Sequence, residues 1–223
     1  TRDQSSRQSI FTGNAVLYEG GNDTYGGTWQ FTAKDGERAW GFTLTDGFDV
    51  NDSNGVGPVV RRDGAGALLR SEDFSNDQRS GGNALRLNYA SPFLGGLIDL
   101  TARYGVNDFE NLTLQTSSTV RRESRYQEDG ASGEFGAVFT RPLGSRLTSE
   151  TRFIHEFDAA DGVALSRTRL NSVDGPEQRF ATDSQGTETI LRSLLRYERS
   201  PSLTFETGGE VAYNMLETDQ AFS

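Results

Sequence analysis

The sequence predicts an all-β protein whose strands form an antiparallel up-and-down sheet. Three observations predict this class: apolar and polar residues alternate over long parts of the chain, short turn-forming sequences separate the alternating runs, and glycine is abundant. The chain has 223 residues, with 26 glycines, 5 prolines and no cysteine. This composition is typical of many strands joined by turns rather than of packed helices.

Composition also narrows the classes of function. A net charge of −10 argues against a nucleic-acid partner, because phosphate binding needs a basic face. The lack of cysteine rules out disulfides, thiolate zinc sites and cysteine nucleophiles. No stretch approaches the roughly 18 apolar residues that a spanning helix requires, and no basic-then-apolar leader opens the chain. We therefore expect either a soluble β-protein or a β-barrel whose signal peptide has been removed.

The clearest alternation runs over residues 84–104. Leu85, Leu87 and Tyr89 alternate with polar residues up to the turn sequence at 91–96. Alternation then resumes, with Ile98, Leu100, Ala102 and Tyr104 on one face and Asp99, Thr101 and Arg103 on the other. Two strands joined by a tight turn are predicted here.

Two further hairpins follow the same pattern. The second places Phe135, Ala137 and Phe139 before a turn at 141–145 and Leu147 to Phe153 after it. The third places Leu191, Leu195 and Tyr197 before a turn at 200–202, and Leu203 to Tyr213 after it.

The N-terminal part predicts about three more strands, around Phe11 to Leu17, Trp29 to Ala33 and Trp40 to Leu44, with a turn at Asp35-Gly36. The total is about nine, within a range of 8–10. Bacterial single-chain barrels have even strand numbers and must close. We therefore expect residues 1–223 to be part of a single, larger barrel domain with remaining strands absent.

Long polar connections are predicted between the hairpins, at residues 51–81, 111–130 and 162–188. Short turns thus alternate with long connections. A soluble sandwich gives no reason for this alternation, whereas an outer-membrane barrel has short periplasmic turns and long extracellular loops. The prediction is a partial transmembrane β-barrel in the bacterial outer membrane, in contact with its lipid.

Side chains on the two faces take different predicted roles. Charged residues at inward positions are predicted to line the lumen, since lipid exposure would be costly; they are Arg86, Asp99, Arg103, Glu134, Glu150 and Arg152. The aromatic residues predicted on the apolar face, which include Phe109, are expected to lie mostly near strand ends. Those predicted to form an interfacial girdle are Tyr89, Tyr104, Phe139, Phe153, Tyr197 and Tyr213.

Candidate chemistry is sparse. The single histidine, His155, lies beside Phe153 and Phe157 on the apolar side and is interpreted as a girdle or packing residue. The oxygen-rich group from Asp49 to Asn54 has no closing glutamate, and we interpret it as a solvated loop rather than a calcium site. We expect no catalytic residues, no metal, no cofactor and no enzymatic activity.

Several segments resemble the barrel strands of TonB-dependent receptors: the hairpin at 84–104 with its Ala-Ser-Pro-Phe-Leu-Gly-Gly turn, the turn at 140–144 and the strand at 203–214. These receptors have a 22-stranded barrel filled by an N-terminal plug. The resemblance implies import of a scarce extracellular ligand such as a siderophore, with the chain's own plug domain and the TonB energy-coupling complex as partners. Neither the plug nor a C-terminal strand ending in an aromatic residue is seen in the sequence.

Two alternatives remain open from the residues. A passive porin-like barrel would share the hairpins but leave a wet channel. A soluble all-β carbohydrate-binding module would bury the aromatic face in a sandwich core.

Overall fold

The computed structural model describes residues 5–17, 23–50 and 54–223. All of its regular structure in these ranges is β-strand. The ten strands are β1 (Ser6–Val16), β2 (Thr24–Asp35), β3 (Arg38–Val50), β4 (Gly55–Arg62), β5 (Leu68–Phe93), β6 (Gly96–Thr116), β7 (Val120–Pro142), β8 (Leu147–Leu170), β9 (Val173–Ser200) and β10 (Leu203–Phe222). Among these residues, no helix is long and apolar enough to cross a membrane.

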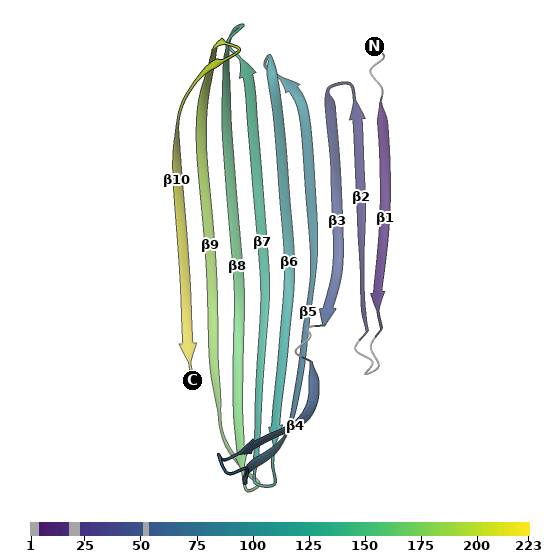
Figure 1. The fold of residues 1–223 in the computed structure, drawn as a ribbon, viewed down its shortest axis with the longest axis vertical. Coiled ribbons are helices and arrows are strands. Elements are labelled where there is room, and N and C mark those ends of the chain that lie inside the picture. The colour runs from purple at the N-terminus through teal and green to yellow at the C-terminus, as the bar shows by residue number, and fades with distance from the viewer. Residues whose placement is uncertain (1–4, 18–22, 51–53) are drawn as a thin grey trace.

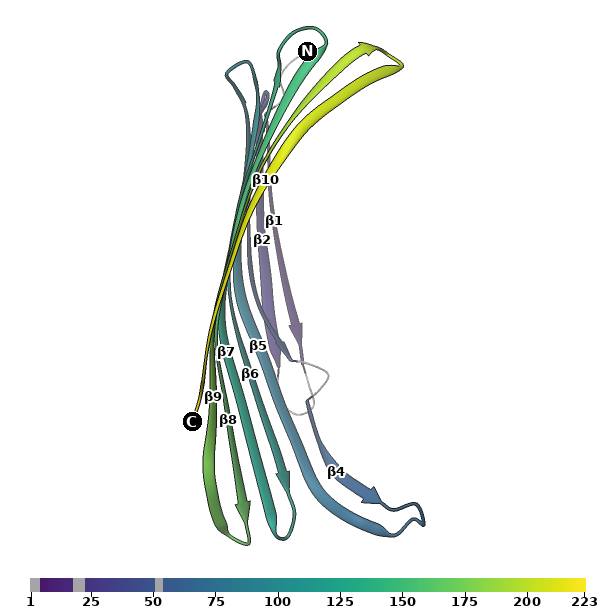
Figure 2. The ribbon, with the colours of Figure 1, turned by 90° about the vertical axis from the view of Figure 1, so that its left-hand side faces the viewer.

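The strands form one antiparallel sheet in chain order, which confirms the predicted fold class. Its order is β1-β2-β3-β5-β6-β7-β8-β9-β10, and β4 pairs only with β5 (Figure 1). Seen edge-on, the sheet is a single curved layer from which the β4–β5 hairpin bends away (Figure 2). The sheet is open: β1 and β10 lie at opposite edges and point in the same direction (Figure 1).

Tight turns stand where the sequence predicts them. β5 and β6 are joined by Leu94 and Gly95, which have φ values of 47° and 75°. A two-residue hairpin with both central residues at positive φ matches the right-handed twist of the strands. The turns after Asp35, Pro142 and Ser200 likewise overlap the predicted turn sequences.

The predicted long loops are wrong in form, because most of their residues belong to strands. β6 continues to Thr116 and β7 begins at Val120; β8 continues to Leu170 and β9 begins at Val173. In these segments charged side chains share the former apolar face with Leu112, Leu114, Val163 and Leu165, so the alternation that identifies a strand becomes weaker while the backbone pairing continues. Polarity alone was therefore misleading as a sign of loop structure.

The strand that sequence reasoning missed is β4. It contains Gly55, Gly57 and Pro58, residues that are unfavourable in a strand interior. β4 tolerates them because only β5 pairs with it, which leaves the other edge of Pro58 without a ladder partner. Ten strands are therefore described, within the predicted range.

The sheet has almost no hydrophobic core. Among the described residues, Ala33 is the only buried hydrophobic side chain, at 8% exposure, and no large side chain is fully buried. Phe11, Tyr104, Phe205 and Tyr213 are each more than half exposed. No second sheet packs on the described residues, so the sandwich core that the soluble alternative requires is not present there.

Candidate functional site

The strand register sorts side chains into an apolar face and a polar face. Leu87 pairs with Ala102, Ala102 with Phe135, and Phe135 with His155, so these residues share one face across β5 to β8. Arg86 pairs with Arg103, and the pair lies on the other face. The register gives the face assignment expected from the alternation, except at Phe109, which lies on the polar face and not on the apolar face where it was expected.

A row of charged residues crosses the polar face. We call it the charge belt, and it contains Arg86, Arg103, Glu134, Glu156 and Glu188, each the direct partner of the next on β5 to β9. Two arginines on neighbouring strands thus lie beside three glutamates on the next three strands. Because like charges directly opposite each other destabilise a sheet, the stability of the sheet does not explain this arrangement.

Two recesses lie along the belt. A recess of about 190 Å³ is lined in part by Arg103, Glu134 and Glu156, together with Asp158. A neighbouring recess of about 330 Å³ is lined by Thr43, Thr45, Ala84, Arg86 and Arg103. Arg103 belongs to both, so the cationic and anionic halves of the belt meet at this side chain.

All six residues predicted to line a lumen lie on the polar face. Arg86, Arg103 and Glu134 belong to the charge belt. Asp99 is in the row that contains Arg152, and Arg152 lies 3.6 Å from Glu150. The structure therefore brings the six to one face, and their lining of a lumen remains a prediction.

The apolar face carries a band without formal charge. This band comprises residues 96–106 of β6, 131–139 of β7, 147–159 of β8 and 185–197 of β9, in which the side chains of this face include no Asp, Glu, Lys or Arg. Each stretch is close to or longer than the roughly 9–11 residues with which a tilted strand crosses a bilayer. Over the same ranges the polar face carries many charges, among them Asp99, Arg103, Glu134, Glu156 and Arg192.

The predicted girdle residues all lie on the apolar face. Tyr104 contacts Phe157 with ring centroids 6.4 Å apart, and Phe139 contacts Phe93 at 5.9 Å, near opposite ends of the band. Phe153 lies inside the band, in the row of Tyr89 and Leu100, and Tyr213 of β10 lies in the row of His155. Tyr197 is beside the turn after Ser200. A girdle formed by these six stays a prediction.

A row of aspartates, which we call the aspartate row, borders the band at the end that is farther from the short turns. The row consists of Asp108, Asp129, Asp161, Asp183 and Asp219, one on each strand from β6 to β10, paired in sequence on the apolar face. All five are exposed. Sequence reasoning missed this row, because only the register aligns residues so far apart in the chain.

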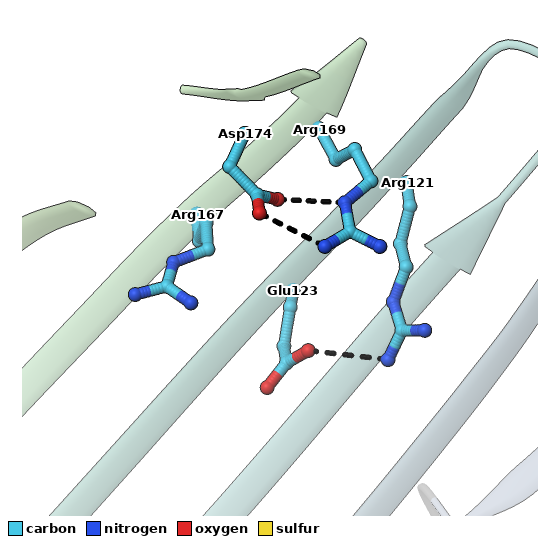
Figure 3. Close-up of a pocket in the computed structure, with 5 residues that line it drawn as sticks. All are labelled: Arg121, Glu123, Arg167, Arg169 and Asp174. Atoms are coloured by element: carbon cyan, nitrogen blue, oxygen red, sulfur yellow. Dashed lines mark hydrogen bonds and ion pairs between the residues drawn. The ribbon is translucent and has the colours of Figure 1, made fainter. Parts of the chain in front are cut away.

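Beyond the aspartate row, the strands continue as an extension in which the former apolar face bears ion pairs. Arg125 lies 2.6 Å from Glu110, and Arg167 lies 3.0 Å from Glu177. Figure 3 shows a cluster in which Arg169 bonds Asp174 twice, at 2.6 and 2.9 Å. These bonds hold the pKa of the Asp174 carboxyl below its ordinary value. The signal that could have revealed the extension is the period-two pattern Arg121, Glu123, Arg125.

His155 packs as expected on the apolar face. Its Nδ1 lies 2.9 Å from the Thr189 hydroxyl of the neighbouring strand. In the part of the chain that the structure describes, no group of three or more acidic or histidine side chains could hold a metal ion. The oxygen-rich segment considered for calcium lies largely outside the described residues, which leave out 51–53.

Comparison with known proteins gives structural neighbours only. No family model and no curated protein matches the chain. The chain is similar to a major outer membrane protein from Thermus thermophilus, with 16% identity, coverage of 80% of this chain and 84% of that one, and a TM-score of 0.35.

Two further solved structures are also similar to the chain. The CymD monoaromatic hydrocarbon channel shows 8% identity over 98% of this chain and 85% of its own, with a TM-score of 0.16. OccK2 (OpdF) from Pseudomonas aeruginosa shows 10% identity over 98% and 96%, with a TM-score of 0.13. Such low TM-scores carry no argument about this chain, whose function must be inferred from its own residues.

Proposed function

We propose that this chain forms part of the wall of a porin-like channel in the bacterial outer membrane and passes small polar solutes. The observation that carries the proposal is the unequal distribution of charge between the two faces of the sheet. Over the band, one face of β6 to β9 carries no formal charge, and the opposite face of the same strands carries many charged side chains. Lipid on one side and water on the other account for both faces at once.

The exposed apolar face favours lipid over water. Large apolar side chains along the band, such as Tyr104, Leu191 and Phe135, are 52%, 51% and 43% exposed. Exposed apolar surface of this extent on a soluble monomer would be an aggregation site. In a bilayer the same surface is solvated by acyl chains, and no core is required.

Closure of the wall needs further strands in this proposal. β1 and β10 run parallel, so direct pairing between them would break the antiparallel order (Figure 1). An odd number of additional strands between these edges restores antiparallel pairing and an even total along the barrel. The chain is then part of one barrel domain, catalyses no reaction and needs no cofactor.

The charge belt is the proposed selectivity element. Rings of charged side chains set ion preference in channels, and the acidic half of the belt exceeds the basic half. A unit charge within about 5 Å is worth roughly 1 kcal/mol even in water. We expect a cation-preferring channel at low salt, and a preference that falls severalfold when Glu134, Glu156 and Glu188 are replaced by glutamine.

Planar-bilayer recordings of the protein purified from outer membranes test this function. Reversal potentials under a salt gradient give the permeability ratio for the parent protein and for the triple glutamine variant. The control is Glu123→Gln, which removes a carboxylate on the opposite face of the extension. Absence of conductance, or an unchanged ratio in the triple variant, would contradict the proposal.

A TonB-dependent receptor is the more specific alternative to a porin-like channel. It predicts a plug against the polar face and a bound ligand such as a siderophore. No feature of the described residues favours a plug over an open lumen, so the porin-like interpretation is preferred. Detection of a plug domain in the complete protein would reverse this preference.

A further inference from the structure

The two faces of the extension differ in chemistry. One face carries the ion pairs of arginine with aspartate or glutamate described above. The polar face carries aromatic rings amid amides and hydroxyls. We call Phe109, Tyr126 and Phe180 the aromatic platform. Phe109 was expected on the apolar face; the register places it on the polar face, because it lies an odd number of residues from Tyr104 on β6.

Tyr126 is fixed on several sides. Its ring centroid lies 5.9 Å from that of Phe109, with the rings inclined at 59°. Its hydroxyl donates a hydrogen bond to the Glu128 carboxylate. A Cβ placed on Gly162 would lie only 3.0 Å from that hydroxyl oxygen, so the absence of a side chain at this glycine makes room for the tyrosine.

Phe180 extends the platform along the same row. Tyr126 pairs with Ala164, and Ala164 pairs with Phe180. Adjacent strands lie about 4.8 Å apart, so the backbones that carry the two rings are about 10 Å apart, with only a methyl group between them. Phe180 is 40% exposed. The two rings therefore lie on either side of the small Ala164 side chain.

Polar groups border these rings. Asn111 pairs with Tyr126, and its side-chain oxygen is buried without a hydrogen-bond partner. An unsatisfied buried acceptor calls for an explanation, and rotation of the Asn111 side chain would present this oxygen to a hydroxyl donor. Gln78 continues the row on β5, while Thr113 bonds Asn76 at 2.7 Å in the next row.

Charge near the platform is limited. Glu128 already accepts the Tyr126 hydroxyl, and Arg122, the nearest arginine on this face of β7, lies 3.5 Å from Glu72. Arg122 is therefore paired with an opposite charge, whereas the neutral Tyr126 hydroxyl does not neutralise the Glu128 carboxylate, and the platform offers no free cation to an anionic solute. Aromatic faces with a few well-placed amide and carboxylate groups suit a solute that has both C–H faces and hydroxyls.

We propose that the aromatic platform binds a neutral oligosaccharide as it enters the channel. This inference rests on the proposed function, since it takes the polar face as the side reached from the lumen. One sugar ring packs on Tyr126 or Phe180, and its hydroxyls bond to Glu128 and the amides of Asn111 and Gln78.

Calorimetric titration of the full chain in lauryldimethylamine oxide micelles tests the proposal, because this detergent has no sugar headgroup. The probes are maltohexaose, cellohexaose and tetragalacturonate. We expect at least one neutral hexaose to bind and tetragalacturonate not to bind. Tyr126→Ala and Phe180→Ala should each weaken binding by up to about tenfold, the loss expected for one aromatic contact.

Matched variants separate the platform from general effects. Gln127→Ala, which alters the neighbouring residue on the opposite face of β7, should leave affinity unchanged, and Tyr126→Phe should retain most of the ring contribution. Absence of binding by both hexaoses, or equal affinity of Tyr126→Ala and Gln127→Ala, would overturn the proposal. A protein that conducts ions but binds no sugar contradicts this inference alone, whereas one that does not conduct contradicts the proposed function.

Discussion

The pKa of Tyr126 indicates whether its hydroxyl is hydrogen-bonded to Glu128. The bond, aided by partial burial, raises the pKa of Tyr126 above its ordinary value. Because the pKa in the folded state is raised, the bond contributes fully to stability below the ordinary tyrosine pKa. That contribution is lost as the pH rises through the folded pKa.

Glu128→Gln is therefore expected to lower the pKa of Tyr126 toward its ordinary value. Ultraviolet difference titration measures this, with Tyr126→Phe identifying the contribution of this residue among the seven tyrosines. Glu123→Gln, on the opposite face of β7, should leave the titration curve unchanged. Identical curves for the parent protein and Glu128→Gln would show that the bond does not form in solution.

Single strands differ in how far their sequence reveals them. β6 was predicted well from Ile98 to Tyr104, because one face meets an apolar environment and the other a polar one. The same strand was not recognised from Asn111 onward, although Leu112 and Leu114 still alternate with polar residues, because polar and charged residues outnumber apolar ones over 111–130. β4 was missed because Gly57 and Pro58 indicate turns. The alternation of apolar and polar residues therefore indicates the environments of a strand's two faces more directly than it indicates that a strand is present.

Adjacent residues on β6 offer a direct test of the face assignment. Arginine in place of Leu100, in the middle of the band, should destabilise the protein in bilayers by about 2–4 kcal/mol, the usual cost of arginine at the membrane midplane. Thr101→Arg, one residue along and on the polar face, should cost far less. Urea unfolding in lipid vesicles gives both values, and equal costs would contradict a lipid-facing band.

The sheet as a whole has features that no single segment predicts. The charge belt and the aspartate row each align residues from separate strands, and only the register of every intervening pair places them in line. The charged members of the belt on β5 to β8 could be predicted as inward-facing, Glu156 by its alternation with Glu150 and Arg152, but Glu188 was not singled out and neither glutamate was expected to align with Glu134. Their significance comes from lying beside Glu134, which is a property of the assembled sheet.

The central claim is that one face of this sheet meets lipid and the other meets water. The chain has no cysteine, so single cysteines can be introduced at each position from 98 to 106 without background and labelled with a nitroxide. Electron paramagnetic resonance in vesicles then measures contact of each label with oxygen, which concentrates in lipid, and with a water-soluble nickel chelate. The account predicts oxygen access at even positions and nickel access at odd positions. Nickel access at every position, or no alternation, would contradict it.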